Sequence, residues 1–596
     1  MIEHRSFGVN FNEPGVASIR LWAPHAKQVA LRLADRKADL PLEKAAYGYW
    51  ELITGQLKPG DKYQFVLDDK TLPDPASLSQ PEGVHGPSKV IDLKDFNWYD
   101  SEWKNPAQDK YIIYELHTGT FTDEGTFLGI ERKLDHLVSL GITAIEIMPV
   151  AQFPGERNWG YDGVFPFAVQ NSYGGALGLM KLVNTCHNKG IAVILDVVYN
   201  HIGPEGNYFT EFGAYFTDKY KTPWGNAINY DDARCDAVRG YFIENALMWF
   251  RDFHIDALRM DAVHAIKDFS TKHILQEIKE EVNRLIDQTG KQHYLIAELD
   301  LNDTRFITPI EKCGYGIDAQ WIDEFHHALR VTAGGERNGY YSDFNGIKDL
   351  AKSYRDAYVY DGIYSPQRLK TFGNKVKDNE GQQFVVFSQN HDQVGNRMLG
   401  ERSSQLFSFE MQKLMAASVM VSPYLPLLFM GEEWSARSPF QYFVSHSDPE
   451  LVEAIRKGRK EEFSAFHRNA EAPDPQSDET FKRSKLNWGQ INAVMLDYYK
   501  TLIQLRKQLP ALSNLNRNNL TVSYNEGHQT LLLKRWQDDQ QVYCLMNFSS
   551  DEHLIDFDGN ENLKQVINSA DKKWDGPGAA NSIQPQSVII YTNLHV

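Results

Sequence analysis

The stretch HIDALRMDAVHAI, residues 254–266, places two aspartates and an arginine inside a segment that is otherwise apolar. Ionised side chains resist burial unless they are paired or used in chemistry. Arg259 and Asp261 stand two residues apart, so on a strand both side chains point to the same side. A guanidinium favours the charged form of a nearby carboxylate, so the pair predicts an ionised Asp261 at a reacting centre or, alternatively, a structural ion pair. Asp256 should face the opposite way, and we expect it to be structural.

The same kind of apolar run recurs along the middle of the chain and predicts its fold. The runs lie at residues 112–117, 144–150, 192–201, 255–261, 294–299, 319–323, 384–392 and 425–431. Between them lie segments such as 237–253, in which apolar residues repeat at the three- and four-residue spacing of a helix. Strands without polar alternation are buried on both faces, which is typical of a parallel sheet covered by helices. Eight such runs predict a closed (β/α)₈ TIM barrel.

The two ends of the chain follow a different period. Apolar and polar residues alternate there, as in QVALRL (28–33) and QVYCLMNFS (541–549), which predicts strands with one buried face. A chain of 596 residues is also too long for a single core. We therefore expect a multidomain α/β protein. Its predicted parts are an N-terminal β-sandwich over residues 1–95, the TIM barrel with loop insertions over 96–512, and a C-terminal antiparallel β domain over 513–596.

Composition argues against several partners and locations. A net charge of −17 argues against nucleic acid and anionic membrane as ligands, because both need clustered lysine and arginine. The longest apolar run, 415–431, contains Pro423 and Pro426, so we expect a buried helix and a strand instead of a membrane span. The segment MIEHRSFGVN lacks the pattern of a signal peptide. The four cysteines form no CxxC pair, so we expect a cytoplasmic protein without disulfides, metal or cofactor.

Polar residues cluster at the carboxyl ends of the apolar runs. They are Asp196, Arg259 with Asp261, Glu298, and His391 with Asp392. In a barrel these ends share one rim, so the side chains should converge on one pocket. Several carboxylates without a metal signature fit the cleavage of a glycosidic bond. Glu298 follows the apolar YLIA and has no cation within two residues, so a raised pKa suited to a proton donor is expected, although Asp300 shares its face and stays an alternative.

Four motifs occur in order: DVVYNH (196–201), ALRMDAVH (257–264), IAELD (296–300) and SQNHDQVGNR (388–397). Together they resemble the four motif regions of the alpha-amylase family of glycoside hydrolases. The resemblance implies that Asp261 is the nucleophile, that Glu298 is the general acid and base, and that Asp392 stabilises the transition state. It also implies retention of configuration, with the Asp261 and Glu298 carboxyls ~5 to 5.5 Å apart.

The resemblance further implies a set of residues that bind the sugar. These are Tyr161 in NWGYDGVFPF (158–167), His201, Arg259 and His391, and we add the neighbouring Trp159, His264 and Asp196. For Asp196 and Asn200, hydrogen bonds that fix the loop are the alternative to a direct contact. Calcium-dependent family members use the first-motif asparagine as a ligand, but no run of oxygen ligands surrounds it here, so we expect no metal site.

A narrower resemblance covers nearly the whole chain. Segments 72–88, 321–344, 361–374 and 439–463 resemble maltooligosyltrehalose trehalohydrolases, although Glu324 stands where that family has a second aspartate. The resemblance implies hydrolysis of the α-1,4 bond next to a terminal trehalose unit, in a pathway with maltooligosyltrehalose synthase. The alternatives are a debranching or branching enzyme of the same family, or a non-catalytic glucan-binding barrel. Three carboxylates kept together argue against a decayed site, because such groups are costly to hold in place.

Overall fold

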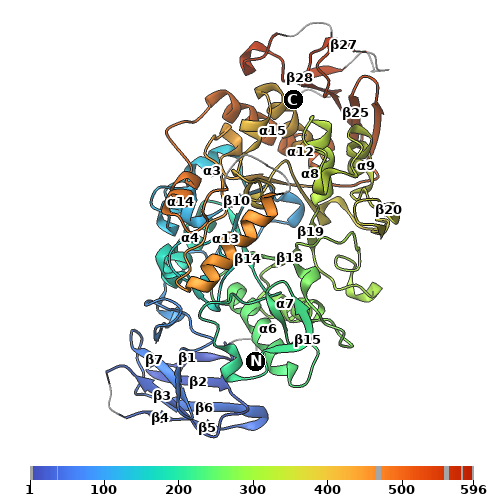
Figure 1. Ribbon diagram of the computed structural model, residues 1–596. Coiled ribbons are helices and arrows are strands. Elements are labelled where there is room, and N and C mark those ends of the chain that lie inside the picture. Colours follow the sequence, from blue (N-terminus) through green and yellow to red (C-terminus); the bar gives the residue numbers. More distant parts are fainter. Residues whose placement is uncertain (1–3, 36–37, 465–471, 556–562, 579–581, 594–596) are drawn as a thin grey trace.

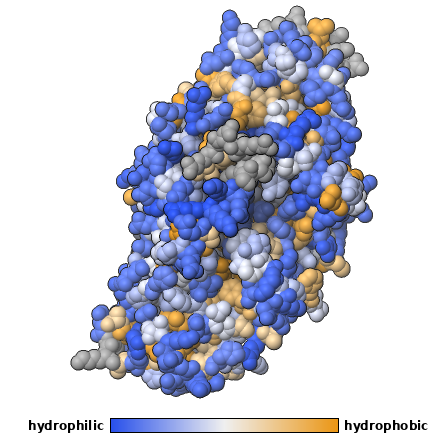
Figure 2. Space-filling view, viewed as in Figure 1, coloured by the Kyte–Doolittle hydropathy of each residue, from blue (hydrophilic) through white to orange (hydrophobic). Residues whose placement is uncertain are grey.

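The computed structural model describes residues 4–35, 38–464, 472–555, 563–578 and 582–593. The chain runs from a pair of small antiparallel sheets, through a closed barrel, to a further antiparallel sheet at the other end of the molecule (Figure 1). This is the multidomain α/β architecture that the sequence predicts. Hydrophilic side chains cover most of the face seen in Figure 2, while apolar side chains gather inside.

Two antiparallel sheets form the N-terminal part of the chain, blue in Figure 1, as the predicted β-sandwich requires. One has the strand order β1 (Gly8–Glu13), β2 (Val16–Trp22), β6 (Tyr49–Thr54), β5 (Glu43–Lys44), and the other has β4 (Leu40–Pro41), β3 (Val29–Leu33), β7 (Lys62–Leu67), β8 (Lys70–Leu72), with β9 (Ser88–Lys89) on β7. Burial alternates along β2 and β7, and the inward residues of both sheets, such as Ile19 and Phe65, join one apolar core. The period of two in the sequence marks this buried face.

The central strands close into a parallel barrel in the order of the sequence. They are β10 (Ile113–Leu116), β11 (Ala144–Ile147), β14 (Ala192–Val197), β17 (Ala257–Met260), β18 (Tyr294–Ala297), β19 (Ala319–Trp321), β22 (Phe384–Phe387) and β23 (Leu425–Phe429). Each strand lies inside one of the predicted apolar runs, so the prediction of a TIM barrel is confirmed. The run 415–431 is a buried helix followed by a strand, also as predicted, because α12 (Phe409–Met420) ends before β23 begins.

Helices and three antiparallel strand pairs lie in the connections between the barrel strands. The main helices there, besides α12, are α3 (Leu134–Leu140), α4 (Gly175–Asn188), α6 (Cys235–Arg251), α7 (Ile274–Thr289), α8 (Asp323–Thr332) and α9 (Ile347–Asp356), and α15 (Ala493–Gln508) follows the last barrel strand. The strand pairs are β12 (Ala151–Gln152) with β13 (Phe165–Val169), β15 (Phe216–Thr222) with β16 (Gly225–Ile228), and β20 (Ile363–Ser365) with β21 (Lys370–Phe372). The segment between β23 and α15 contains two further helices, α13 (Pro449–Ser464) and α14 (Asp478–Ser484). Helix α13 crosses in front of the barrel in Figure 1. Arg459 of α13 donates a hydrogen bond of 3.3 Å to the carbonyl of Gly395. Within the described residues, no helix is both long and apolar enough to span a membrane.

The C-terminal part is a five-stranded antiparallel sheet with a small two-stranded sheet beside it, which confirms the predicted architecture. The larger sheet has the order β24 (Leu520–Asn525), β25 (Thr530–Gln537), β26 (Gln540–Asn547), β30 (Ser587–Thr592), β28 (Lys564–Asn568), and the smaller one pairs β27 (His553–Leu554) with β29 (Ser582–Ile583). Alternate residues of β25, including Leu531 and Leu533, are buried. The period of two predicted this arrangement as well.

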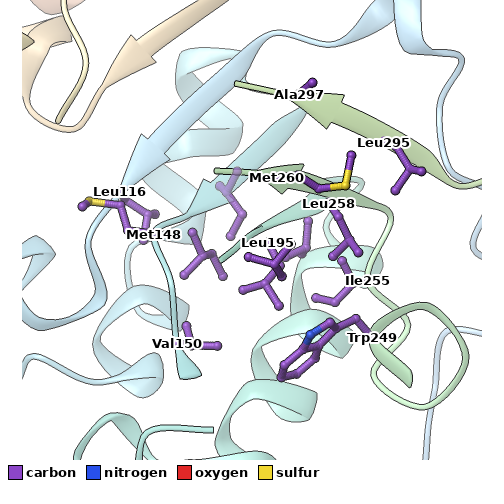
Figure 3. Close-up of a cluster of buried hydrophobic side chains, with 14 of the residues drawn as sticks. Leu116, Met148, Val150, Leu195, Trp249, Ile255, Leu258, Met260, Leu295 and Ala297 are labelled. Carbon is purple, nitrogen blue, oxygen red and sulfur yellow. The ribbon is translucent and has the colours of Figure 1, made fainter. Parts of the chain in front are cut away.

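Side chains on the barrel strands alternate between an outer face and the lumen. Figure 3 shows outer-face residues of several strands, among them Leu195, Leu258 and Leu295, gathered near Trp249 of α6. The residues between them form a separate buried cluster inside the barrel, which includes Ile113, Ala144, Ile194, Ala257 and Ile296. Two residues further along each of these five strands, the same face carries Glu115, Glu146, Asp196, Arg259 and Glu298. The apolar lumen thus ends in a charged layer at the carboxyl ends of the strands.

Asp256 lies before the start of β17, at the opposite end of the strand from Arg259. Its Oδ2 accepts a hydrogen bond of 2.7 Å from the backbone of Val193 and lies 2.9 Å from Nε2 of His187. The other nitrogen of that imidazole lies 2.8 Å from Asp100. Asp256 therefore has structural partners at the amino-terminal end of the barrel, as expected from its position.

Substitution of Leu258 by alanine tests the outer-face core. The Leu258 side chain is fully buried within the apolar cluster of Figure 3, so its removal leaves a cavity. We expect Leu258→Ala to lower the free energy of unfolding by about 2–5 kcal/mol. The matched control is Leu554→Ala, since Leu554 is 84% exposed and its loss should cost less than about 0.5 kcal/mol. Urea titration of both variants measures the difference, and equal losses would contradict the assigned core.

Candidate active site

Arg259 is the centre of the charged layer. Its side chain is fully buried, and Nη1 donates hydrogen bonds of 2.8 Å to Oδ2 of Asp196 and 2.9 Å to Oδ1 of Asp261. Nη2 lies 3.9 Å from Oε2 of Glu298, and the guanidinium lies 4.4 Å from the ring centre of Trp321. One cation therefore faces three carboxyls from three strands, β14, β17 and β18.

Asp261 follows β17 and is held from two sides. In addition to Arg259, the amide of Asn200 donates hydrogen bonds of 2.9 Å to Oδ2 of Asp261 and 2.8 Å to its carbonyl. Both carboxylate oxygens of Asp261 therefore accept a hydrogen bond. The next residue, Ala262, has a positive φ of 41°, and its N–H donates a hydrogen bond of 2.7 Å to Oε2 of Glu298. The left-handed turn after Asp261 thus directs the backbone toward Glu298.

Glu298 and Asp300 follow the same strand, yet their surroundings differ. The side chain of Glu298 is 17% exposed, and burial raises its pKa to about 8, with Arg259 opposing the rise and the charge of Asp261 adding to it. Asp300 is 55% exposed, and its two oxygens accept hydrogen bonds of 2.6 and 2.9 Å from Arg368 in the β20–β21 hairpin. Of the two candidate acids, Glu298 is the buried one next to Arg259.

Tyr161 connects Asp196 with His391. Its hydroxyl donates a hydrogen bond of 2.7 Å to Oδ2 of Asp196 and lies 2.8 Å from Nε2 of His391. The Tyr161 and His391 rings stack with their centres 5.4 Å apart. Burial raises the pKa of Asp196 to about 7, although Arg259 acts against it. Nε2 of His391 also lies 3.4 Å from Oδ2 of Asp392, whose side chain is 42% exposed in the short helix α10 (His391–Gly395).

The remaining predicted residues lie around this centre. Nε2 of His201 lies 2.9 Å from the carbonyl of Tyr161, and the ring of His201 stacks on Trp224 of the loop between β15 and β16 at 4.1 Å. Nδ1 of His264 accepts a hydrogen bond of 3.2 Å from the backbone of Asp300. Trp159 is 4% exposed and lies edge-on to His391, so a direct sugar contact by its ring stays a prediction. The structure brings all ten predicted residues to one rim of the barrel.

Three acids at the same rim were missed by the sequence analysis. Glu115 and Glu146 occupy lumen-facing positions of β10 and β11, and Asp323 begins α8 directly after β19. Burial raises the pKa of Asp323 to about 7, with the charge of Asp392 adding to the rise. The sequence did indicate these three residues in one way. Each is an acidic residue an even number of positions from residues of its apolar run that face the barrel lumen, so its side chain should face the lumen too. Glu324, which departs from the family pattern, is buried and accepts hydrogen bonds from Asn302 and the backbone of residues 359 and 360.

The arrangement separates two carboxyls by their environments. Asp261 has a cation and an amide as donors, whereas Glu298 is desolvated and holds a proton more tightly. Such a pair can supply an anionic nucleophile and a proton donor at the same pH. Among the described residues, no three or more His, Cys, Asp or Glu side chains are arranged to hold a metal ion.

Comparisons with known proteins show which families and structures this chain is similar to. Residues 97–225 match the family described as alpha amylase, catalytic domain, and residues 6–81 match carbohydrate-binding module 48, the isoamylase N-terminal domain. Malto-oligosyltrehalose trehalohydrolase from Saccharolobus solfataricus is 51% identical over 84% of this chain and 87% of its own, and that from Mycobacterium tuberculosis is 42% identical over 87% and 91%. A crystal structure of a putative alpha amylase from Salmonella typhimurium has a TM-score of 0.91 and 36% identity, covering 99% of this chain and all of that one.

The variant Arg259→Met tests the role of the buried cation in holding the carboxylates. Methionine removes the charge that pairs with Asp196 and Asp261, and leaving buried charges unpaired should lower the free energy of unfolding by about 3–5 kcal/mol near neutral pH. The pKa of Asp196 is already raised to about 7 and should rise further without Arg259, whereas in the unfolded chain it is about 3.9. The folded variant then binds the proton more tightly than the folded wild type, and the two differ in bound protons between about pH 7 and the higher pKa of the variant. The deficit of the variant should therefore shrink as the pH falls through that range toward about 7, and stay nearly constant at lower pH.

Urea unfolding of this variant and the wild type at about pH 9 and pH 6 measures the effect. The matched control is Arg284→Met, whose side chain is 63% exposed in a surface ion pair, and it should lose less than about 1 kcal/mol at both values. A deficit for Arg259→Met that is as small as the control, or that does not change with pH, would contradict the assignment.

Proposed function

The chain belongs to the malto-oligosyltrehalose trehalohydrolases, glycoside hydrolases with an alpha-amylase catalytic domain, and we propose that it releases trehalose from maltooligosyltrehalose. The bond cleaved is the α-1,4 linkage next to the terminal trehalose unit. The observation that carries the assignment of the reacting groups is the contact of Arg259 with Asp261 beside the desolvated Glu298. It provides an ionised carboxylate and a protonated carboxyl at one rim of the barrel.

We propose that the first step forms a covalent glycosyl-enzyme. The carboxylate of Asp261 attacks the anomeric carbon, while the carboxyl of Glu298 gives its proton to the departing glycosidic oxygen. Arg259 and Asn200 each donate a hydrogen bond to the Asp261 carboxylate and fix its direction. The raised pKa of Glu298 keeps the proton available near neutral pH. Trehalose leaves as the aglycone.

In the second step Glu298, now ionised, takes a proton from water as that water attacks the glycosyl-enzyme. The two displacements together retain the configuration at the anomeric carbon. Asp392, with its half-exposed side chain, stabilises the positive charge that develops on the sugar ring. The products are trehalose and a maltooligosaccharide shortened by that unit.

The surrounding side chains divide into sugar contacts and supports. We propose that Tyr161, His201, His264 and His391 contact the sugar at the cleavage point. Arg259 was predicted to do the same, but its side chain is fully buried, so we propose that it acts on the sugar through Asp261. Asp196 is buried and accepts hydrogen bonds from Tyr161 and Arg259, so it holds both in place. Trp159 lies edge-on to His391 with the ring centres 5.6 Å apart, and a sugar contact by its ring stays part of the proposal.

We also propose a division of the chain into three domains and a place for the reaction. The boundaries 1–95, 96–512 and 513–596 follow the change of period in the sequence, and the match of residues 6–81 to a carbohydrate-binding module supports a glucan-binding role for the first domain. The substrate is supplied by maltooligosyltrehalose synthase, in the cytoplasm. Scattered cysteines without a CxxC pair support a reducing compartment.

A product assay tests the function. The protein is incubated separately with maltooligosyltrehalose, maltopentaose and pullulan, and the sugars released are separated and identified. We expect trehalose from the first substrate at a rate far above any release of maltose or linear glucan from the other two. Cleavage of pullulan without release of trehalose would instead identify a debranching enzyme, and formation of new branches would identify a transferase.

Substitution of the reacting carboxyls tests the mechanism. Asp261→Asn and Glu298→Gln should each lower kcat by roughly 10³-fold or more, because each removes a group needed in the transition state, while the thermal unfolding midpoint stays close to that of the wild type. Asp300→Asn is the matched control, since Asp300 lies on the same strand end but pairs with Arg368 at the surface. It should keep kcat within about tenfold. Near-normal turnover by Glu298→Gln together with loss in Asp300→Asn would assign the acid to Asp300.

A further inference from the structure

Two acids beneath the site have no part in the steps above. Glu115 on β10 and Glu146 on β11 are register partners on neighbouring strands, and each residue is 1% exposed. Burying two carboxyls side by side is costly unless each is paired or protonated. The two acids have different hydrogen-bonding partners, and these partners indicate a different protonation state for each.

Glu115 accepts two hydrogen bonds from a single residue. Its Oε1 lies 2.5 Å from Nδ1 of His391, and its Oε2 accepts a hydrogen bond of 3.0 Å from the backbone N–H of His391. Both carboxylate oxygens of Glu115 thus face N–H groups of His391. Since a carboxylate can only accept, Nδ1 of His391 must carry a proton. Glu115 therefore fixes both the position of the ring and the protonation of one of its nitrogens.

The other ring nitrogen faces Tyr161 and Asp392. The Tyr161 hydroxyl has one hydrogen, and it is given to Oδ2 of Asp196 at 2.7 Å. The contact of 2.8 Å between that hydroxyl and Nε2 of His391 is then a hydrogen bond only if Nε2 donates. Asp392 Oδ2, 3.4 Å from the same nitrogen, can likewise only accept. Every contact of the His391 ring is satisfied when both nitrogens carry protons, and neutral His391 would compete with Asp196 for the hydrogen of Tyr161.

Glu146 has the opposite surroundings. Both of its oxygens are buried, and neither accepts a hydrogen bond from any residue that the structure describes. Burial raises the pKa of Glu146 well above its usual value, and the charge of Glu115 adds to the rise. Glu146 is therefore a neutral acid next to an ionised one, which makes it a natural control for Glu115.

Charged and titratable groups face His391 from every side. They are Glu115 on β10, Glu146 on β11, Asp196 on β14, Arg259 on β17, Asp392 on its own helix, and Tyr161 and His117 in neighbouring loops. Burial lowers the pKa of His391, but the charges of Asp392 and Glu115 outweigh it and raise the pKa to about 9, against Arg259. The pKa of His391 thus depends mainly on burial and on two carboxylates. Of these two, Glu115 is the one in direct contact with the ring, at 2.5 Å.

We propose that Glu115 is a positioning residue for the hydrolysis, which holds His391 doubly protonated so that Nε2–H, not a lone pair, faces the sugar site. This inference rests on the proposed function, because it assigns the state of a residue at that site. Imidazolium at His391 leaves the hydrogen of Tyr161 with Asp196, which in turn accepts from Arg259, the donor to Asp261. Glu115 thereby acts through His391 on the groups around the reacting carbon.

The variant Glu115→Gln tests this role through the pH profile. In the wild type, ionisation of Glu298, whose pKa is about 8, should end activity on the alkaline side, since His391 stays protonated to about pH 9. A contacting opposite charge is worth roughly 1–3 pKa units. A fall of about two units would bring the pKa of His391 below that of Glu298, and the alkaline limb of kcat/KM should then move down by about one pH unit. We expect kcat at neutral pH to fall by roughly tenfold or more, because a carboxylate that orients a histidine and sets its protonation contributes to turnover through that histidine.

Glu146→Gln is the matched control. It replaces a neutral acid by a neutral amide at the neighbouring register position, so kcat and the alkaline limb should stay close to those of the wild type. The inference is overturned if Glu115→Gln keeps the wild-type limb, or if Glu146→Gln moves the limb as far. Release of trehalose by the wild type in the same assay tests the proposed function separately, because the inference concerns only the differences between variants.

A second pair of variants covers the case in which Glu115→Gln does not fold, as judged by circular dichroism. Glu115→Asp keeps the charge but withdraws it by one methylene from His391, so kcat should fall well below that of Glu146→Asp while the alkaline limb stays in place. Equal kcat values for Glu115→Asp and Glu146→Asp would overturn the inference, since a carboxylate that positions nothing tolerates the same change.

Discussion

The contact of one buried guanidinium with carboxyls from neighbouring strands is the constraint on which the site depends. Arg259 has no exposed surface and contacts Asp196 at 2.8 Å and Asp261 at 2.9 Å, with Glu298 at 3.9 Å. Charges buried at this depth are tolerated only when they compensate one another. The cation therefore allows acids to gather where the apolar lumen ends, and their unequal surroundings give them different proton affinities.

The alternation of side chains on the barrel strands explains how stability and chemistry coexist. Outer-face residues such as Leu195 and Leu258 pack against helices, while the lumen-facing residues between them change from apolar to charged toward the carboxyl ends. The same strand thus supports the fold with one face and the site with the other. From Glu115 to Asp261, hydrogen-bonded groups continue through His391, Tyr161, Asp196 and Arg259, so a change of charge deep in the barrel can reach the reacting carboxylate.

The architecture and the rim could be predicted from the sequence because both depend on local patterns. The apolar runs predicted the eight barrel strands. The polar residues at the ends of these runs predicted which side chains meet at the rim. Long-range contacts left no comparable signal: Glu115 and His391 are separated by 276 residues, and no pattern in either segment indicates their contact. Asp300 and Glu298 lie two residues apart, so the sequence predicted the same facing direction for both and could not decide which one is the acid. Only the β20–β21 hairpin, which brings Arg368 to Asp300, distinguishes the two. The stacking of Trp224 on His201 likewise depends on a hairpin whose position the sequence did not reveal.

The central claim is that Asp261, Glu298 and Asp392 surround one scissile linkage. The most direct measurement is a crystal structure of the Glu298→Gln variant with intact maltooligosyltrehalose bound. The account predicts that the anomeric carbon next to the trehalose unit lies about 3–3.5 Å from a carboxylate oxygen of Asp261, with the glycosidic oxygen toward residue 298 and the ring beside Asp392. A glucan chain bound elsewhere, with no sugar in contact with Asp261, would contradict it.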